Sequence, residues 1–251
     1  MAGRVSLSAR LKALADMVTR GNRVCDVGCD HGYLSIYLAE QKISPGVLAM
    51  DVREGPLGQA REHVALAGLG DYIALRLSDG LTAFEIGQAQ TLVCAGMGGR
   101  LMERILAREP DKSRSFEELI LQPQSEIAAF RRFLKKEGYS ILREDMIWED
   151  GKFYPVIKAS FSGPESASGQ ETGQCGELEE RFGPYLLKVR HPVLYECLKR
   201  ERESARTLAD ALKEKAQESG RAAGRLLELT EEIGYLEQAL RLWDTDAAAS
   251  D

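Results

Sequence analysis

Two hydrophobic periods alternate along the first two-thirds of the chain. Short runs rich in Val, Leu and Ile predict strands at residues 23–27, 47–52, 72–77, 91–96 and 118–123. Segments with apolar residues at helical spacing separate these strands, at residues 31–41, 54–67, 100–108 and 125–137. A further amphipathic helix is predicted at residues 6–20, with Ser6 or Ser8 as its cap. This alternation predicts a mostly parallel sheet with helices on both faces.

Two longer strands end this region, at residues 139–148 and 152–161. The turn Glu149-Asp150-Gly151 between them is typical of a β-hairpin. Such a hairpin would add an antiparallel edge to the sheet. We therefore expect residues 1–161 to form one α/β domain.

The remaining residues differ in composition. Residues 162–177 are rich in Gly, Ser and Glu and predict a flexible linker. Beyond the linker, apolar residues follow heptad spacing at Leu194, Leu198, Ala205, Leu208, Leu212, Leu226, Leu229, Ile233, Leu236, Leu240 and Trp243, with Glu201 breaking the pattern. Gly220 and Gly224 flank the expected turn. Residues 178–245 thus predict a helical hairpin packed as an antiparallel coiled coil, which could pair within one chain or between chains.

The charge of -6 lies wholly in the second part of the chain. Residues 1–161 contain 21 basic and 21 acidic residues, so any surface for a nucleic acid must be a local patch. No apolar run is long enough to cross a membrane, and no secretory segment begins the chain. The five scattered cysteines include no C-x-x-C pair, and Cys25, Cys29 and His31 are too crowded to bind zinc. We expect reduced thiols, no metal site and a cytoplasmic protein.

Chemistry is expected where the strands end, because ligands of open α/β sheets bind beyond the carboxyl ends of the strands. The first such segment runs from Asp26 to Gly32. Gly28 permits a tight turn, and Gly32 allows the following helix to start close to a ligand. Both could instead be ordinary turn glycines. A dinucleotide site would have a second glycine where Asp30 stands. A carboxylate there repels a pyrophosphate and attracts a sulfonium or ammonium group, which favours S-adenosylmethionine.

The next two segments add carboxylates. Asp51, followed by Val52, could accept hydrogen bonds from ribose hydroxyls, or it could cap the helix at Glu54. Asp79 could accept from an adenine amino group, with Gly80 leaving room for the base. Alternatively, Asp79 and Gly80 could form only an ordinary turn at the end of a strand.

The fourth segment, CAGMGG at residues 94–99, brings backbone close to something bulky. We expect Ala95 and Gly96 to contact the cofactor, and Met97 and Gly98 to face the substrate. Met97 could instead serve packing alone. An N-P-P-Y or D-P-P-Y segment is missing here, which argues against methylation of adenine N6.

Several segments resemble a known family. They are LSARL (7–11), DVGCDHGYL (26–34), CAGMGG (94–99), LILQPQ (119–124) and FGPYLLKVRHPVLYECLKRE (182–201). Together they are similar to the bacterial tRNA adenine-N1 methyltransferases of the TrmK family. The resemblance implies a Rossmann-like class I methyltransferase sheet with a carboxyl-terminal coiled coil, which transfers a methyl group from S-adenosylmethionine to N1 of adenine 22 in tRNA. Ser35 departs from the family, where proline is expected.

This reaction needs alignment more than proton transfer. Adenine N1 attacks through a neutral lone pair, and the methylated base is cationic, so a nearby carboxylate would stabilise the developing charge. Asp30 is the candidate, with His31 orienting it or contacting the base. The alternatives are a helix cap for Asp30 and a structural hydrogen bond for His31. Because N1 lies on the pairing edge, the base must be unpaired or extruded.

Substrate contacts have weaker signals. Gln122 and Gln124 could read the adenine edge, or cap the end of a strand. Phosphate contacts need Lys or Arg, and the candidates are Arg10, near the amino terminus, and Arg100 and Arg104, on one helix face. The rival interpretations are a methyltransferase for another RNA or a small molecule, a noncatalytic interaction module that binds S-adenosylmethionine, and a nicotinamide-dependent enzyme.

Overall fold

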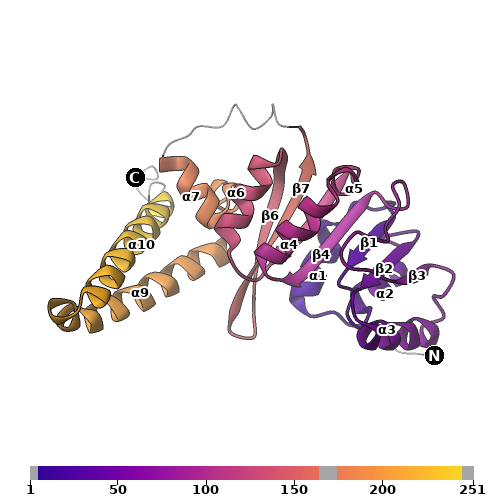
Figure 1. The fold of residues 1–251 in the computed structure, drawn as a ribbon, viewed down its shortest axis with the longest axis horizontal. Coiled ribbons are helices and arrows are strands. Elements are labelled where there is room, and N and C mark those ends of the chain that lie inside the picture. Colours follow the sequence, from indigo (N-terminus) through magenta and orange to yellow (C-terminus); the bar gives the residue numbers. More distant parts are fainter. Residues whose placement is uncertain (1–4, 164–173, 245–251) are drawn as a thin grey trace. The chain divides into compact units, whose positions relative to one another are not determined.

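The computed structural model describes residues 5–163 and 174–244. The chain divides near residue 170 into two compact units, of which the first holds the sheet and the second the carboxyl-terminal helices (Figure 1). Among the described residues, no helix combines the length and the apolar character needed to span a bilayer. The domain bounds of 161 and 178 stay a prediction.

A seven-stranded sheet forms the centre of the first unit, in the order β3-β2-β1-β4-β5-β7-β6. Its strands are β1 (Val24–Val27), β2 (Val47–Asp51), β3 (Ile73–Leu77), β4 (Thr91–Met97), β5 (Glu118–Pro123), β6 (Tyr139–Glu149) and β7 (Lys152–Phe161). Strands β1 to β5 pair in parallel. The predicted Rossmann-like sheet is confirmed, and each predicted strand end lies within about one residue of the observed end, as is usual for assigned boundaries.

The hairpin lies at the edge of the sheet, as predicted, but its antiparallel strand is not the outermost one. Strand β7 is inserted between β5 and β6 and runs antiparallel to both. Asp150 and Gly151 in its turn have φ of 48° and 77°, the positive values that a tight hairpin turn requires. Because β6 runs parallel to β5, the hairpin turn lies at the same edge as the carboxyl ends of β1 to β5.

Helices cover both faces of this sheet. One hydrophobic cluster joins Val24 to Leu14 and Leu38, from α1 (Ala9–Met17) and α2 (Tyr33–Glu40), and α3 (Glu54–Leu66) packs in the same cluster. The other joins Cys25 to α4 (Gly99–Arg108) and α6 (Ile127–Lys136), with the short α5 (Pro110–Arg114) following α4. Alternate residues of β1 thus point to opposite clusters. Burial on both faces explains the almost continuous apolar runs of the parallel strands.

The first residues of α1 and α2 determine which neighbouring residues belong to the preceding loops. The Oγ of Ser8 accepts a hydrogen bond from the N–H of Leu11 at 3.4 Å, so Ser8 rather than Ser6 caps α1. Helix α2 begins at Tyr33, because Gly32 with a φ of 77° is its N-cap and Asp30 with a φ of 50° is also left-handed. The predicted start at residue 31 was therefore wrong. So was the alternative that Asp30 caps this helix, and both Asp30 and His31 belong to a loop.

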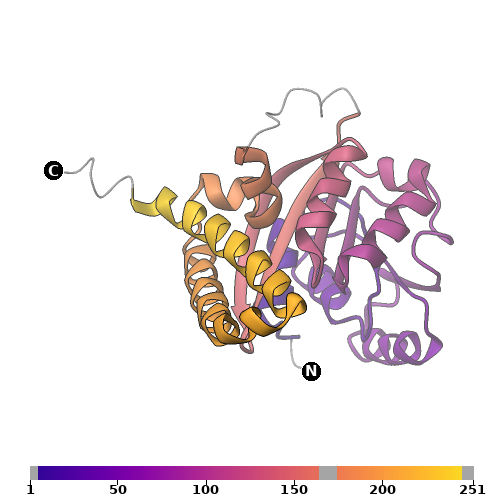
Figure 2. The same cartoon turned by 60° about the vertical axis from the view of Figure 1, so that its left-hand side comes forward.

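The second unit is helical. It consists of α7 (Gln174–Phe182), α8 (Pro184–Lys188), α9 (Pro192–Glu218) and α10 (Gly220–Asp244). Helices α9 and α10 lie side by side as a hairpin (Figures 1 and 2), and buried Ala205, Ala209 and Leu229 form their contact. Coiled-coil packing in heptads stays a prediction.

Details of this unit differ from expectation. Ser219 alone separates the two long helices, so Gly220 and Gly224 lie inside α10 rather than flanking a turn. Leu208, placed in the seam by its spacing, is 44% exposed, because its neighbour Ala209 faces α10 instead. Residues 174–177 of the expected linker begin α7, and residues 164–173 lie outside the described residues.

Candidate functional site

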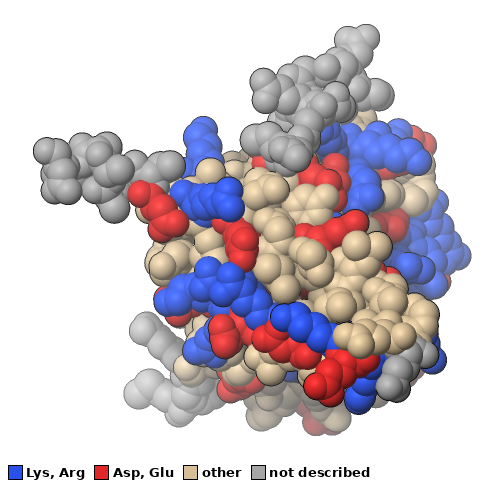
Figure 3. Space-filling view, turned by 90° about the vertical axis from the view of Figure 1, so that its left-hand side faces the viewer, with Lys and Arg blue, Asp and Glu red and all other residues tan. Residues whose placement is uncertain are grey.

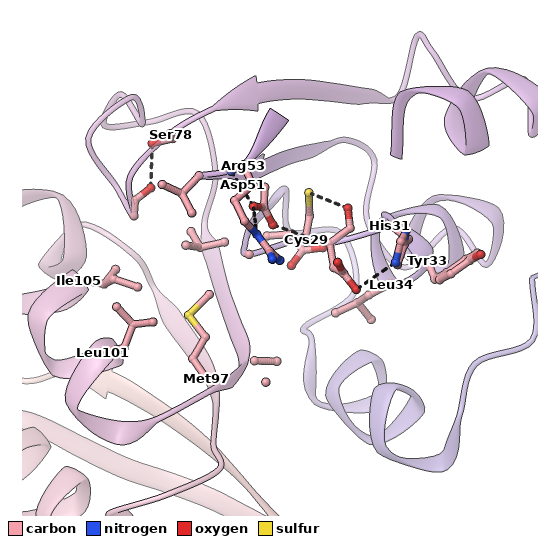
Figure 4. Close-up of a pocket in the computed structure, with 18 of the residues that line it drawn as sticks. Cys29, His31, Tyr33, Leu34, Asp51, Arg53, Ser78, Met97, Leu101 and Ile105 are labelled. Carbon is pink, nitrogen blue, oxygen red and sulfur yellow. Dashed lines mark hydrogen bonds and ion pairs between the residues drawn. The ribbon is translucent and has the colours of Figure 1, made fainter. Parts of the chain in front are cut away.

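A cavity of about 510 Å³ opens where β1, β2 and β4 end (Figure 4). This volume falls in the range of small-molecule sites. Of the residues predicted from sequence, those that line the cavity are Arg10, Asp26, Gly28, Asp30, His31, Asp51, Val52, Asp79, Gly80, Ala95, Gly96, Met97 and Gln124. The sheet topology thus brings together segments more than eighty positions apart.

Five predicted residues do not line the cavity, namely Gly32, Gly98, Arg100, Arg104 and Gln122. Other residues that line the cavity were not predicted to be site residues, and these include Leu11, Leu34, Arg53, Leu101 and Ile105. Leu101 and Ile105 lie one turn apart on α4, directly after the glycine loop. That spacing is the one clue in the sequence that they share a face.

The first turn is shaped by glycine. Gly28 has a φ of 76°, and its N–H and that of Cys29 donate to the carbonyl of Met50 at 2.8 and 3.0 Å. These bonds fix the turn against the end of β2. A Cβ on Gly28 would lie 2.2 Å from Cε of Met97. Any larger residue would therefore be strained and would displace Met97 from the cavity wall.

Asp26 is a buried carboxylate, 4% exposed, in the wall of the cavity. The hydroxyl of Ser35 donates to its Oδ2 at 2.6 Å. Burial raises the pKa of Asp26 to about 6, the hydrogen bond from Ser35 opposes this rise, and the negative charge of Asp51 adds to it. A positive group bound nearby would stabilise the ionised form of Asp26.

Asp51, also buried, organises the neighbouring loops. Its Oδ2 accepts a hydrogen bond from the N–H of Asp30 at 3.2 Å, and its Oδ1 accepts from the N–H of Arg53 at 2.9 Å. Arg53, not Asp51, is the N-cap of α3. The capping alternative for Asp51 is therefore wrong. Each carboxylate oxygen retains a lone pair for a ligand hydroxyl.

Asp30 and His31 meet at the rim. Nε2 of His31 lies 3.6 Å from Oδ2 of Asp30, whose side chain is 59% exposed. The backbone carbonyl of His31 lies 2.9 Å from Nδ1 of His63 on α3, which anchors the loop. The ring of Tyr33 stacks on His63 with centroids 4.9 Å apart. Figure 4 shows His31 and Tyr33 on the same side of the cavity.

The loop after β3 closes another side. The hydroxyl of Ser78 donates to the carbonyl of Gly80 at 2.8 Å, and Gly80 has a φ of 61°. A Cβ there would lie 3.2 Å from Ile105. Asp79 is largely exposed and pairs with Arg108 of α4. Val52, Leu101 and Ile105 supply an apolar lining between these polar groups.

A polar network borders the cavity beside the hairpin. Nη1 of Arg10 donates to Oε1 of Gln122 at 2.8 Å, the N–H of Arg10 donates to Glu149 at 3.3 Å, and its guanidinium lies 5.4 Å from the Tyr154 ring centroid. Gln122 is fully buried beneath Arg10, whereas Gln124 lines the cavity. The structure therefore offers Gln124, rather than Gln122, to a ligand in the cavity.

The glycines of the fourth segment have different roles. Gly96 is the extra residue of a bulge in β4, since Ala95 pairs with Gln122 and Met97 with Pro123. Gly96 lines the cavity. A Cβ on Gly98 would instead lie 2.9 Å from Oγ of Ser125. The expected close approach at Gly98 is therefore to the loop before α6, not to a ligand.

The basic face of α4 lies outside the cavity. Arg100 and Arg104 are exposed, and Nε of Arg100 pairs with Glu126 at 2.8 Å. Residues 5–163 and 174–244 contain no cluster of three or more potential metal ligands.

Comparisons with known proteins agree with this geometry. Residues 7–157 match the model of a family described as a methyltransferase domain. The tRNA (adenine(22)-N(1))-methyltransferase of Bacillus subtilis is 30% identical over 94% of this chain and 98% of its own length. The crystal structure of the B. subtilis m1A22 tRNA methyltransferase TrmK is 29% identical, with a TM-score of 0.80 over 94% of this chain and 99% of that one.

A third similar structure carries a ligand. It is Streptococcus pneumoniae Sp1610 in complex with S-adenosyl-L-methionine, 33% identical, with a TM-score of 0.79 over 94% of this chain and 100% of that one. The domain match covers more than half of the chain, and the B. subtilis relative matches nearly its full length. The chain is therefore a member of the tRNA (adenine(22)-N(1))-methyltransferase family.

Proposed function

We propose that this protein transfers a methyl group from S-adenosylmethionine to N1 of adenine 22 in tRNA. The observation that carries the proposal is the pair of buried carboxylates, Asp26 and Asp51, beside the left-handed turn at Gly28. Two anions in a cavity of this size favour a cationic donor over a pyrophosphate. The named relatives supply the substrate, since one acts on adenine 22 of tRNA.

The cavity residues fit the donor. S-adenosylmethionine, when bound, supplies an electrophilic methyl group on a positively charged sulfur. Asp26 would hold its ammonium group, Asp51 its ribose hydroxyls and Asp79 its adenine amino group, while Val52, Ala95 and Gly96 would pack against it. The absence of a Cβ at Gly28 lets the side chain of Met97 pack against this turn in the cavity wall. These groups bind and orient the donor, and the apolar lining from α4 excludes water.

The rim fits the acceptor base. Asp30, fixed by its N–H to Asp51, presents a carboxylate that would stabilise the charge developing on the methylated adenine. His31 would orient this carboxylate from 3.6 Å. Arg10, Met97 and Gln124 border the same cavity and would contact the base. Gln122 would act indirectly, by holding Arg10 in place.

The RNA surface must be local. On one face of the molecule, Lys and Arg gather in separate groups with acidic side chains between them (Figure 3). Of the three arginines predicted to contact phosphates, Arg10 lines the cavity, whereas Arg100 and Arg104 are exposed on α4, the helix that follows the glycine loop. We propose that Arg100 and Arg104 contact tRNA phosphates. We also propose that residues 178–245 form a separate domain. The reaction is proposed to take place in the cytoplasm.

The decisive experiment maps the methylated position. Purified protein incubated with S-adenosylmethionine and unmodified tRNA should yield N1-methyladenine at position 22, found by mass spectrometry of nuclease fragments. Free adenosine is the matched substrate that lacks the RNA. Methylation of free adenosine at an equal rate would favour a small-molecule methyltransferase. Donor binding without any methylation would favour a noncatalytic module, and binding of NADH alone would overturn the proposal.

Gly28→Ala should weaken donor binding by about tenfold or more, because the new Cβ meets Met97 and the backbone is left-handed. Isothermal titration calorimetry with S-adenosylmethionine measures the effect. Gly21→Ala is the matched control, since Gly21 has a φ of 94° and no atom within 4 Å of its Cβ position. Equal losses in the two variants would show backbone strain alone.

Asp30→Asn should leave donor affinity within about twofold and lower kcat on tRNA by about tenfold or more, because the carboxylate charge is needed in the transition state. Single-turnover methylation assays separate the two effects. Asp71→Asn, which changes an exposed carboxylate before β3 at the opposite edge of the sheet, should change neither. Full turnover by the Asp30 variant would remove the electrostatic role.

Replacing Arg100 and Arg104 together by alanine should weaken tRNA binding and make the dependence of log K on log salt shallower by about one to two. Fluorescence anisotropy with labelled tRNA over a salt series measures both. The control pair is Arg20 and Arg23, exposed before β1 at the other edge of the sheet. An unchanged slope in the α4 variant would exclude this helix from the interface.

A further inference from the structure

Ser35 is a buried hydroxyl with one specific partner. It lies in the first turn of α2, fully buried, and is not among the residues that line the cavity. Its Oγ donates to Oδ2 of Asp26 at 2.6 Å. A hydroxyl has one hydrogen to donate, and here it is directed at the buried carboxylate. Ser35 can therefore act on a ligand only through Asp26.

The other groups around Asp26 act against its charge or are neutral. From β2, the negative charge of Asp51 raises the pKa of Asp26. From β1 and its turn come the thiols of Cys25 and Cys29, and from β4 comes Cys94. Burial raises the pKa of all three thiols, that of Cys94 to about 12, so they are uncharged near neutral pH. Among these described neighbours, Ser35 is the group that favours ionised Asp26.

We infer that Ser35 is a positioning residue for the methyl donor, which holds Asp26 as an anion in the orientation that receives a cationic amino acid group. The inference rests on the proposed function of the cavity. Without the hydroxyl, the buried carboxylate would take up a proton at a higher pH than it does now. As the pH is lowered, donor affinity would then begin to fall at a higher pH than in the unchanged protein. At alkaline pH, where Asp26 is ionised in both proteins, the affinity would recover.

The test compares donor binding across pH. Dissociation constants for S-adenosylmethionine and S-adenosylhomocysteine are measured by calorimetry for the unchanged protein, Ser35→Ala and Ser35→Cys. If the substitution to alanine raises the pKa of Asp26 from about 6 to about 7, the ratio of dissociation constants would be about five near pH 6 and about one near pH 9. The ratio cancels the titration of the ligand's own groups, because both proteins bind the same ligand.

Two variants sharpen the comparison. Ser35→Cys keeps a weak donor and should give an intermediate ratio. Ser44→Ala removes another buried hydroxyl, which donates to the carbonyl of Gly46 at 2.7 Å before β2, at the far edge of the sheet. This control should bind the donor equally at every pH. Carbon-13 NMR of labelled Asp side chains reads the titration of Asp26 directly.

The outcomes separate the inference from the proposed function. A ratio that rises toward acid pH, together with a higher pKa of Asp26 by NMR, supports the positioning role. A ratio that is constant with pH overturns it and shows a structural role only. Failure of the unchanged protein to bind either ligand at any pH would instead refute the proposed function.

Discussion

The burial of two carboxylates, Asp26 and Asp51, in the wall of one cavity is the constraint on which the site depends. Asp26 is the last residue but one of β1 and Asp51 is the last residue of β2, and these two strands are paired neighbours in the sheet. Burial disfavours the charged form of Asp26, and the negative charge of Asp51 disfavours it further. A cationic ligand relieves that cost and an anionic ligand adds to it. The same constraint explains why the protein places hydrogen-bond donors from Ser35, Asp30 and Arg53 around these two carboxylates.

Much of this arrangement could be predicted because strand ends are visible in the sequence. The apolar runs of β1, β2 and β4 end at a carboxylate or a glycine, and parallel topology then gathers those ends at one edge. The order of strands β7 and β6 in the sheet was harder to predict from the sequence. Either order satisfies the same hydrophobic alternation, and pairing of β7 with β5 depends on long-range contacts that no local pattern encodes.

The misplaced residues share one physical reason, which is that spacing does not reveal the direction of a side chain. Gln122 and Gln124 flank Pro123, the last residue of β5, yet the first is buried under Arg10 and the second lines the cavity. Gly98 was assigned to a ligand because glycine marks close approach, and it does, but the approaching atom belongs to Ser125. In α9, a shift of one position exposes Leu208 and buries Ala209, since the helix faces its partner with small residues.

The close packing at Gly98 has a consequence for the cavity. Gly99 is packed even more tightly, as a Cβ there would lie 2.7 Å from the carbonyl of Ser125, and its N–H donates to that carbonyl at 3.0 Å. The start of α4 is thereby fixed to the loop before α6. Because Leu101 and Ile105 project from α4 into the cavity, the apolar wall is held by backbone contacts on the far side of the helix. Rigid placement of this kind suits a reaction whose rate depends on alignment rather than on proton transfer.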